Sequence, residues 1–66
     1  MTKQADISAR EAEILTLVGE HLSNAEIGAR LFISVRTVDS HLSRVYLKLG
    51  VPGRAELRDH PALGAR

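Results

Sequence analysis

Hydroxyl, imidazole and cationic side chains supply most of the chemistry available to this chain of 66 residues. Ser8, Ser23 and Ser34 could act as nucleophiles only beside a histidine and a carboxylate, and their spacing indicates no such partners. Each serine instead stands where a helical pattern begins, so its hydroxyl can accept a hydrogen bond from a backbone N–H. The sequence therefore assigns these serines to helix caps and predicts no catalytic residue and no enzyme.

The three histidines could ligate a metal ion only if the fold brought them together. His21, His41 and His60 fall on different predicted elements, and the chain has no cysteine. Neither the spacing nor the residue types match a protein metal site. The sequence therefore predicts no metal and no cofactor, and His41 is expected to pack beside an apolar stripe.

The cations of this chain are gathered in one stretch, although the net charge is only +1. Residues 30–54 hold five cations and one acid, whereas residues 1–29 hold two cations and five acids. Because a polyanion responds to local charge, the distribution favours a nucleic-acid partner more than the sum does. The cations of the stretch are Arg30, Arg36, Arg44, Lys48 and Arg54, and its acid is Asp39.

Helices must position these side chains, and the sequence indicates where two neighbouring helices begin. Ser23 and Glu26 have the spacing of a capping box, and Ser34 with Thr37 places a second hydroxyl at a helix start eleven residues later. Only Phe32 and Ile33 remain to connect the two predicted helices. Two helix starts with so short a link are typical of a helix-turn-helix.

The rest of the chain completes an all-α, four-helix domain. Ser8 and Glu11 repeat the capping-box spacing, Gly50 is placed for a left-handed C-cap, and Pro61 is expected to stop the last helix. Gly28 is expected to let a neighbouring helix approach. The predicted helices run from Ser8 to about residue 20 and over about 24–31, 35–49 and 53–60. The predicted organisation is a leader or linker stub at 1–6, the domain at 7–60 and a tail at 61–66.

The third predicted helix separates an apolar stripe from a polar face. Its apolar positions are Val38, Leu42, Val45 and Leu49. Opposite them or on the flanks lie Arg36, Thr37, Asp39, Ser40, Ser43, Arg44, Tyr46, Leu47 and Lys48. The sequence thus predicts an exposed face of short side chains edged by cations.

Four motifs in one order carry a family resemblance: residues 8–15 (SAREAEIL), 22–27 (LSNAEI), 33–42 (ISVRTVDSHL), and 48–51 (KLGV) with 54–57 (RAEL). With these motifs the chain resembles the LuxR-type (GerE or NarL-like) DNA-binding domain of bacterial transcription regulators. The resemblance implies that the third helix enters the major groove of double-stranded DNA while the second crosses the backbone. It also implies that the fourth helix pairs two protomers. RNA polymerase is a further candidate partner of a domain that regulates or reads promoters.

Residue roles follow from the resemblance. Base-reading positions fall on Asp39, Ser40 and Ser43, whereas Thr37, Arg44 and Lys48 fall where phosphate contacts are expected, with Arg36 on the same face. The chain departs from the family pattern at three places: Asp39 is acidic, Leu47 is apolar, and Arg58-Asp59-His60-Pro61 replaces apolar dimer contacts. Asp39 could accept a hydrogen bond from a cytosine amino group or repel a misplaced phosphate. The last departure argues against dimerisation through the fourth helix.

Two alternatives stay open beside the leading hypothesis, a regulator or response-regulator effector domain that reads DNA. A sigma-factor domain that reads promoters has similar caps, although residues 48–51 and 54–57 favour the LuxR type. A helical protein-interaction module that has lost DNA binding is compatible with Asp39, Leu47 and the modest net charge. No apolar run approaches the roughly 18 residues of a membrane span, so we expect a cytoplasmic protein.

Overall fold

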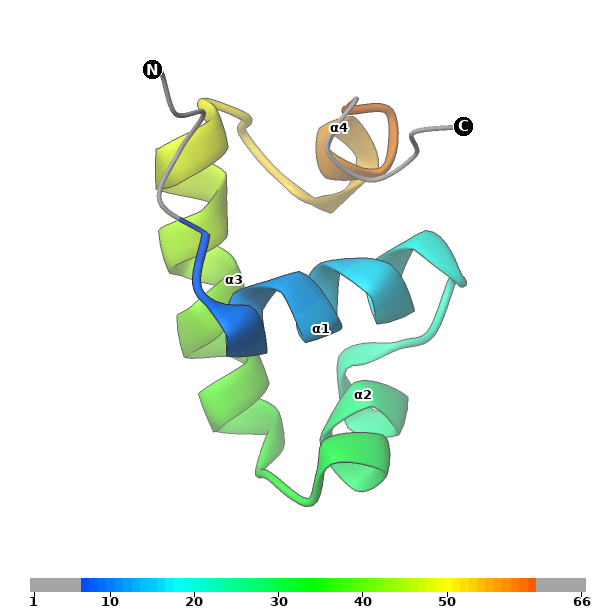
Figure 1. The fold of residues 1–66 in the computed structure, drawn as a ribbon. Coiled ribbons are helices and arrows are strands. Elements are labelled where there is room, and N and C mark those ends of the chain that lie inside the picture. The colour runs from blue at the N-terminus through cyan, green and yellow to red at the C-terminus, as the bar shows by residue number, and fades with distance from the viewer. Residues whose placement is uncertain (1–6, 61–66) are drawn as a thin grey trace.

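The computed structural model describes residues 7–60, and within them it contains four helices and no strand. These helices are α1 (Ala9–Gly19), α2 (Asn24–Leu31), α3 (Val35–Leu49) and α4 (Arg54–Arg58). In Figure 1, α3 runs along one side of the domain, and α1, α2 and α4 lie on the other. The all-α, four-helix class predicted from the sequence is confirmed. The predicted leader at 1–6, the tail at 61–66 and Pro61 lie outside the described residues.

One hydrophobic core joins all four helices. Burying each large apolar side chain in it contributes on the order of 2 kcal/mol. From α3 the stripe residues Val38, Leu42 and Val45 are buried, and Leu49 is half-buried at the edge. Among residues 7–60, the buried apolar side chains are Ile14, Leu15, Leu17, Val18, Ile27, Val38, Leu42, Val45 and Leu57.

Reciprocal hydrogen bonds begin the first two helices. The Ser8 hydroxyl accepts from the Glu11 N–H at 3.1 Å, and Glu11 Oε1 accepts from the Ser8 N–H at 3.0 Å. Ser23 and Glu26 repeat the arrangement at 3.1 and 2.7 Å. Backbone donors that would otherwise lack partners are thereby satisfied at both helix starts.

The end of α3 has the geometry that the sequence predicts. Gly50 adopts φ +69° at the C-cap, a left-handed conformation that costs a glycine little. The Val51 N–H then donates to the Tyr46 carbonyl at 3.0 Å, and both side chains pack against the core. The chain turns sharply after α3 and heads toward α4.

Two other helix ends use left-handed residues that are not glycine. His21 follows α1 with φ +67°, and its N–H donates to the Val18 carbonyl at 2.9 Å. Phe32 caps α2 with φ +61°. A bulky side chain in this region is strained. The ends of α1 and α2 nevertheless agree with the predicted ends at about residue 20 and at residue 31.

The fourth helix is shorter than predicted. It spans Arg54–Arg58 rather than 53–60, with Gly53 as its N-cap. The Asp59 and His60 N–H groups bond to carbonyls three residues back, at 3.2 and 3.0 Å, and this tighter turn ends the helix. Leu57 is buried, whereas Ala55 on the same helix is exposed.

Candidate nucleic-acid interface

A hydroxyl pair fixes the start of α3. The Ser34 Oγ accepts from the Thr37 N–H at 3.0 Å and lies 2.9 Å from the Thr37 Oγ1. Both residues are exposed, so the cap stands at the surface. The first turn of α3 therefore presents two hydroxyls and, on the same turn, the exposed cation Arg36.

The connection between α2 and α3 is held by close backbone packing at Gly28. The Ile33 N–H donates to the Gly28 carbonyl at 2.9 Å. A Cβ added at Gly28 would lie 2.6 Å from the Ile33 carbonyl oxygen, which is closer than real Cβ contacts come. Gly28 was expected to admit a neighbouring helix, but its close neighbour is the turn that leads into α3.

All seven side chains proposed from the sequence for DNA contact lie exposed on α3. Their helical positions bring them opposite the buried stripe or to its flanks, and Figure 1 shows no other helix on the side of α3 opposite α1, α2 and α4. Leu47 shares this side and is 84% exposed. The seven residues are Arg36, Thr37, Asp39, Ser40, Ser43, Arg44 and Lys48. We call this set the α3 face.

The centre of the α3 face has short side chains. Ser40 and Ser43 project only a hydroxyl each, so another molecule can approach the helix backbone closely. Asp39 is the single acid of the face and makes no ion pair with another described residue. Arg44 likewise makes no ion pair within residues 7–60. These two opposite charges are therefore available to an external partner.

Lys48 differs from the other members of the face because an acid already holds it. Its Nζ lies 2.7 Å from Glu11 Oε1, which joins the last turn of α3 to the first turn of α1. The Glu11 side chain is 3% exposed and that of Lys48 is 31% exposed. The sequence indicates only a capping role for Glu11, because no local pattern connects residues 37 positions apart.

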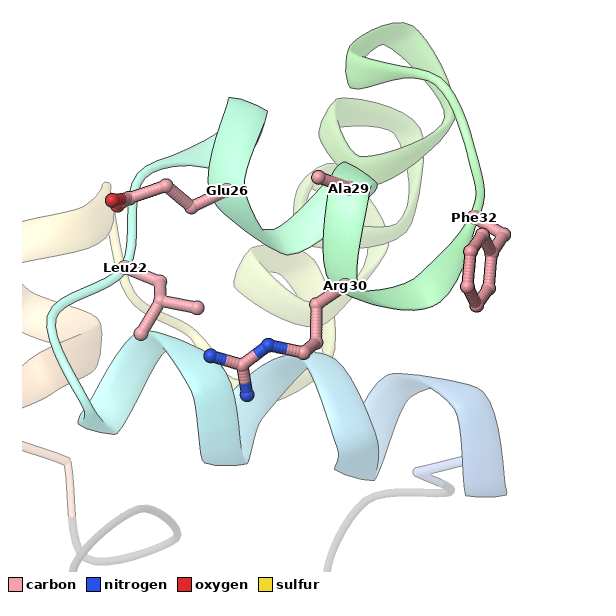
Figure 2. A pocket seen from close by; sticks show the side chains of 5 residues that line it. All are labelled: Leu22, Glu26, Ala29, Arg30 and Phe32. Carbon is pink, nitrogen blue, oxygen red and sulfur yellow. The ribbon is translucent and has the colours of Figure 1, made fainter.

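The other two cations of the 30–54 stretch lie away from the α3 face. Arg30 lines a surface pocket with Leu22, Glu26, Ala29 and Phe32, and in Figure 2 its side chain is directed toward Leu22 and α1. The phenyl ring of Phe32 stands at the far end of the same pocket and is 93% exposed. The five cations of residues 30–54 are therefore close together in the sequence, but they do not all lie on one surface of the structure.

Arg54 ties α4 to the start of α2. Its Nη1 donates to the Asn24 Oδ1 at 2.6 Å, and its Nη2 donates to the Leu22 carbonyl. A planar guanidinium can satisfy both acceptors at once. Arg54 is therefore a structural cation in this fold, a role that its sequence context did not indicate.

Two glutamates of the capping boxes have lowered pKa values. The hydrogen bond from Lys48, followed by that from the Ser8 backbone, holds the pKa of Glu11 below its usual 4.5, although burial opposes the shift. The Ser23 backbone hydrogen bond lowers the pKa of Glu26 from the same ordinary value. Both carboxylates are therefore charged at neutral pH.

The histidines do not assemble with acids into a metal-binding group anywhere in residues 7–60. His41 is half-buried on α3, and its Nδ1 is buried without a hydrogen-bond partner. Among the described helices, none is long and apolar enough to cross a membrane.

Comparison with known families finds one model that covers most of the chain. The model is described as "Bacterial regulatory proteins, luxR family" and matches residues 5–60. This match confirms the resemblance inferred from the four sequence motifs, and it favours the LuxR type over the sigma-factor alternative.

Relatives and a solved structure point the same way. The chain is 48% identical over 56 residues to the putative HTH-type transcriptional regulator Rv0890c of Mycobacterium tuberculosis, covering 85% of this chain and 6% of that protein. It is 41% identical over 54 residues to the oxygen regulatory protein NreC of Staphylococcus aureus, covering 82% of this chain and 25% of NreC. A crystal structure of the response regulator ChrA, from a heme-sensing two-component system, aligns with a TM-score of 0.79 and 46% identity over 89% of this chain and 29% of that chain. The chain thus spans less than a third of each of these longer proteins.

Proposed function

Because this chain belongs to the luxR family of bacterial regulatory proteins, we propose that it binds double-stranded DNA through the α3 face, which enters the major groove. It would serve as a transcription regulator or as the effector domain of one. The observation that carries the proposal is the capped, uncovered helix α3, whose exposed side combines short polar residues with cations. DNA binding of this kind would take place in the bacterial cytoplasm.

The proposed base contacts come from the centre of the face. Ser40 and Ser43 can donate to or accept from several base edges, so each should discriminate weakly. A carboxylate such as Asp39 can only accept, and the donors in the major groove are the amino groups of cytosine and adenine, of which we propose that of cytosine as its partner. Selectivity at the Asp39 position should therefore exceed that at the two serines.

The proposed phosphate contacts come from the edges of the face. Arg44 has no competing acid among the described residues, and Arg36 and Thr37 lie in the first turn of α3. Such contacts release counterions, so the logarithm of the binding constant should fall with the logarithm of salt concentration, by a slope of about 0.9 for each phosphate neutralised. Affinity should depend mainly on these contacts.

A salt titration with a labelled mixed-sequence duplex tests the proposal. We expect binding that weakens as salt concentration rises. Arg44→Gln should reduce the slope of this dependence by about 1 and weaken binding to all duplex sequences alike. Arg10→Gln is the matched control, because Arg10 pairs with Glu13 on α1 and lies outside the α3 face. Binding that does not change with salt would contradict the proposal.

Selection of bound sequences from a random duplex pool tests the base contacts. We expect Asp39→Asn to change the preferred base at one position while the rest of the site is kept. Inverted half-sites in the selected pool would indicate that two copies bind together, the arrangement proposed for the family's fourth helix. An identical consensus for the wild type and Asp39→Asn would contradict the role of Asp39.

A protein-interaction module is the second candidate function, and two exposed apolar side chains favour it. Phe32 is 93% exposed and Leu47 is 84% exposed. Chemical-shift mapping with a random duplex separates the candidates. Shifts centred on α3 support DNA binding, whereas a duplex that leaves α3 unshifted supports the interaction module.

A further inference from the structure

We infer that Lys48 is a positioning residue for DNA binding, which holds α3 against the start of α1 through Glu11, and not one of the phosphate contacts. The inference rests on the proposed function and changes the role that the family resemblance gives to this residue. It follows from where the ammonium and its partner acid lie.

The Glu11 carboxylate is the site at which the two helices are joined. A single oxygen, Oε1, accepts both from the Ser8 N–H at 3.0 Å and from the Lys48 Nζ at 2.7 Å. Ser8 is the N-cap of α1, and Lys48 lies in the last turn of α3. One buried carboxylate therefore connects the start of α1 to the end of the proposed recognition helix.

Burial makes this connection difficult to exchange for a phosphate contact. A carboxylate that is 3% exposed has lost most of its water, so it depends on the ammonium for compensation. Moving Lys48 to a DNA phosphate would leave Glu11 as an unpaired buried charge, which is strongly unfavourable. The pair should therefore persist when DNA binds.

The pair also adds little to the attraction between the domain and DNA. Its two opposite charges lie within hydrogen-bond distance, so their fields nearly cancel at the distance of a phosphate. Arg44, one turn earlier on α3, has no such partner among the described residues. Counterion release should thus be governed by Arg44 and not by Lys48.

The test compares Lys48→Met, Glu11→Gln, the double variant and Arg44→Met, with the salt titration measured on a mixed-sequence duplex. All measurements are made at a temperature where circular dichroism shows each variant to be folded. We expect Lys48→Met to bind several-fold more weakly with the slope of the wild type, because α3 is misplaced. Arg44→Met should reduce the slope by about 1.

Glu11→Gln separates the two roles further. If Lys48 were a phosphate contact restrained by Glu11, removing the acid's charge would release it and strengthen binding. We expect Glu11→Gln to weaken binding or leave it unchanged. The double variant should melt at a higher temperature than Lys48→Met, because it leaves no unpaired carboxylate. If Lys48→Met fails to fold, the salt titration can still be made on the double variant.

Each outcome decides the inference. A slope reduced by about 1 in Lys48→Met or the double variant makes Lys48 a phosphate contact and overturns the inference. Unchanged affinity in both folded variants limits the pair to stability and also overturns it. If the wild type shows no salt-dependent binding, the proposed function itself fails. This result can be told apart from the two outcomes above, because in those the wild type binds DNA.

Discussion

Glu11 links the stability of the domain to pH. Its pKa is lowered below 4.5 by the hydrogen bond from Lys48 first and that from the Ser8 backbone second. The folded state therefore binds a proton more weakly than the unfolded state, so stability is complete above the ordinary pKa and is lost as pH falls through the folded value. Urea unfolding measured from neutral pH to below 4.5 should show a decreasing free energy of unfolding, and Glu11→Gln should flatten part of this decrease.

The remaining acid dependence should come from Glu26, whose pKa is lowered in the same direction. Glu13→Gln is the control, because Glu13 makes only an exposed pair with Arg10. If the free energies of unfolding of the wild type and Glu11→Gln changed in parallel with pH, protonation of Glu11 would not contribute to the pH dependence of stability.

Phe32 holds a strained backbone conformation without burying its ring. Its φ is +61° and its side chain is 93% exposed, so the residue gains little packing to offset the strain. Phe32→Gly should raise the free energy of unfolding by about 1 kcal/mol, as measured by urea denaturation. Gly50→Ala is the opposite case, because φ is +69° and a Cβ there meets nothing within 4 Å, so strain alone should lower stability. A destabilised Phe32→Gly would mean that the ring makes contacts that its exposure does not indicate.

At the scale of the elements, the turn between α2 and α3 leaves no room for a side chain at Gly28. In an exposed helix interior, Gly→Ala stabilises by about 1 kcal/mol. At Gly28 the new Cβ would lie 2.6 Å from the backbone oxygen of Ile33, which cannot rotate away. We expect Gly28→Ala to lower the free energy of unfolding by about 1–3 kcal/mol in urea denaturation. Ala29→Gly, at an exposed position of the same helix, should cost only the propensity difference. A stabilised Gly28→Ala would show that the turn can shift.

The starts of the helices could be predicted from the sequence, and so could the ends of α1, α2 and α3, whereas α4 ends before the predicted residue 60. Serine followed three residues later by glutamate places a cap locally, so the starts of α1 and α2 follow from a few neighbouring residues. The left-handed conformations of His21 and Phe32 have no local sequence signal, whereas that of Gly50 has one. The seven residues of the α3 face were all predicted to be exposed, because helical period alone decides that. The partners of Lys48 and Arg54 lie 37 and 30 residues away and depend on how the helices pack.

At the scale of the whole molecule, the surface of α4 bears on how copies of the chain associate. The one buried apolar side chain of α4, Leu57, is used in the domain's own core. The exposed positions of this helix and its C-cap are Ala55, Glu56, Arg58 and Asp59. A stable interface needs a contiguous apolar centre, which these residues do not form. Dimerisation through α4 should therefore be weak without DNA.

Sedimentation of the free chain at micromolar concentration should accordingly give the mass of a monomer, 7.2 kDa. Ala55→Leu combined with Arg58→Leu supplies the apolar contact that α4 lacks, because the two positions are exposed and three residues apart on one helix. This variant should shift the distribution toward a dimer, while Ala55→Ser with Arg58→Gln should remain monomeric. A wild-type chain that sediments as a dimer would place the association surface elsewhere, with exposed Leu47 and Phe32 as the next positions to substitute.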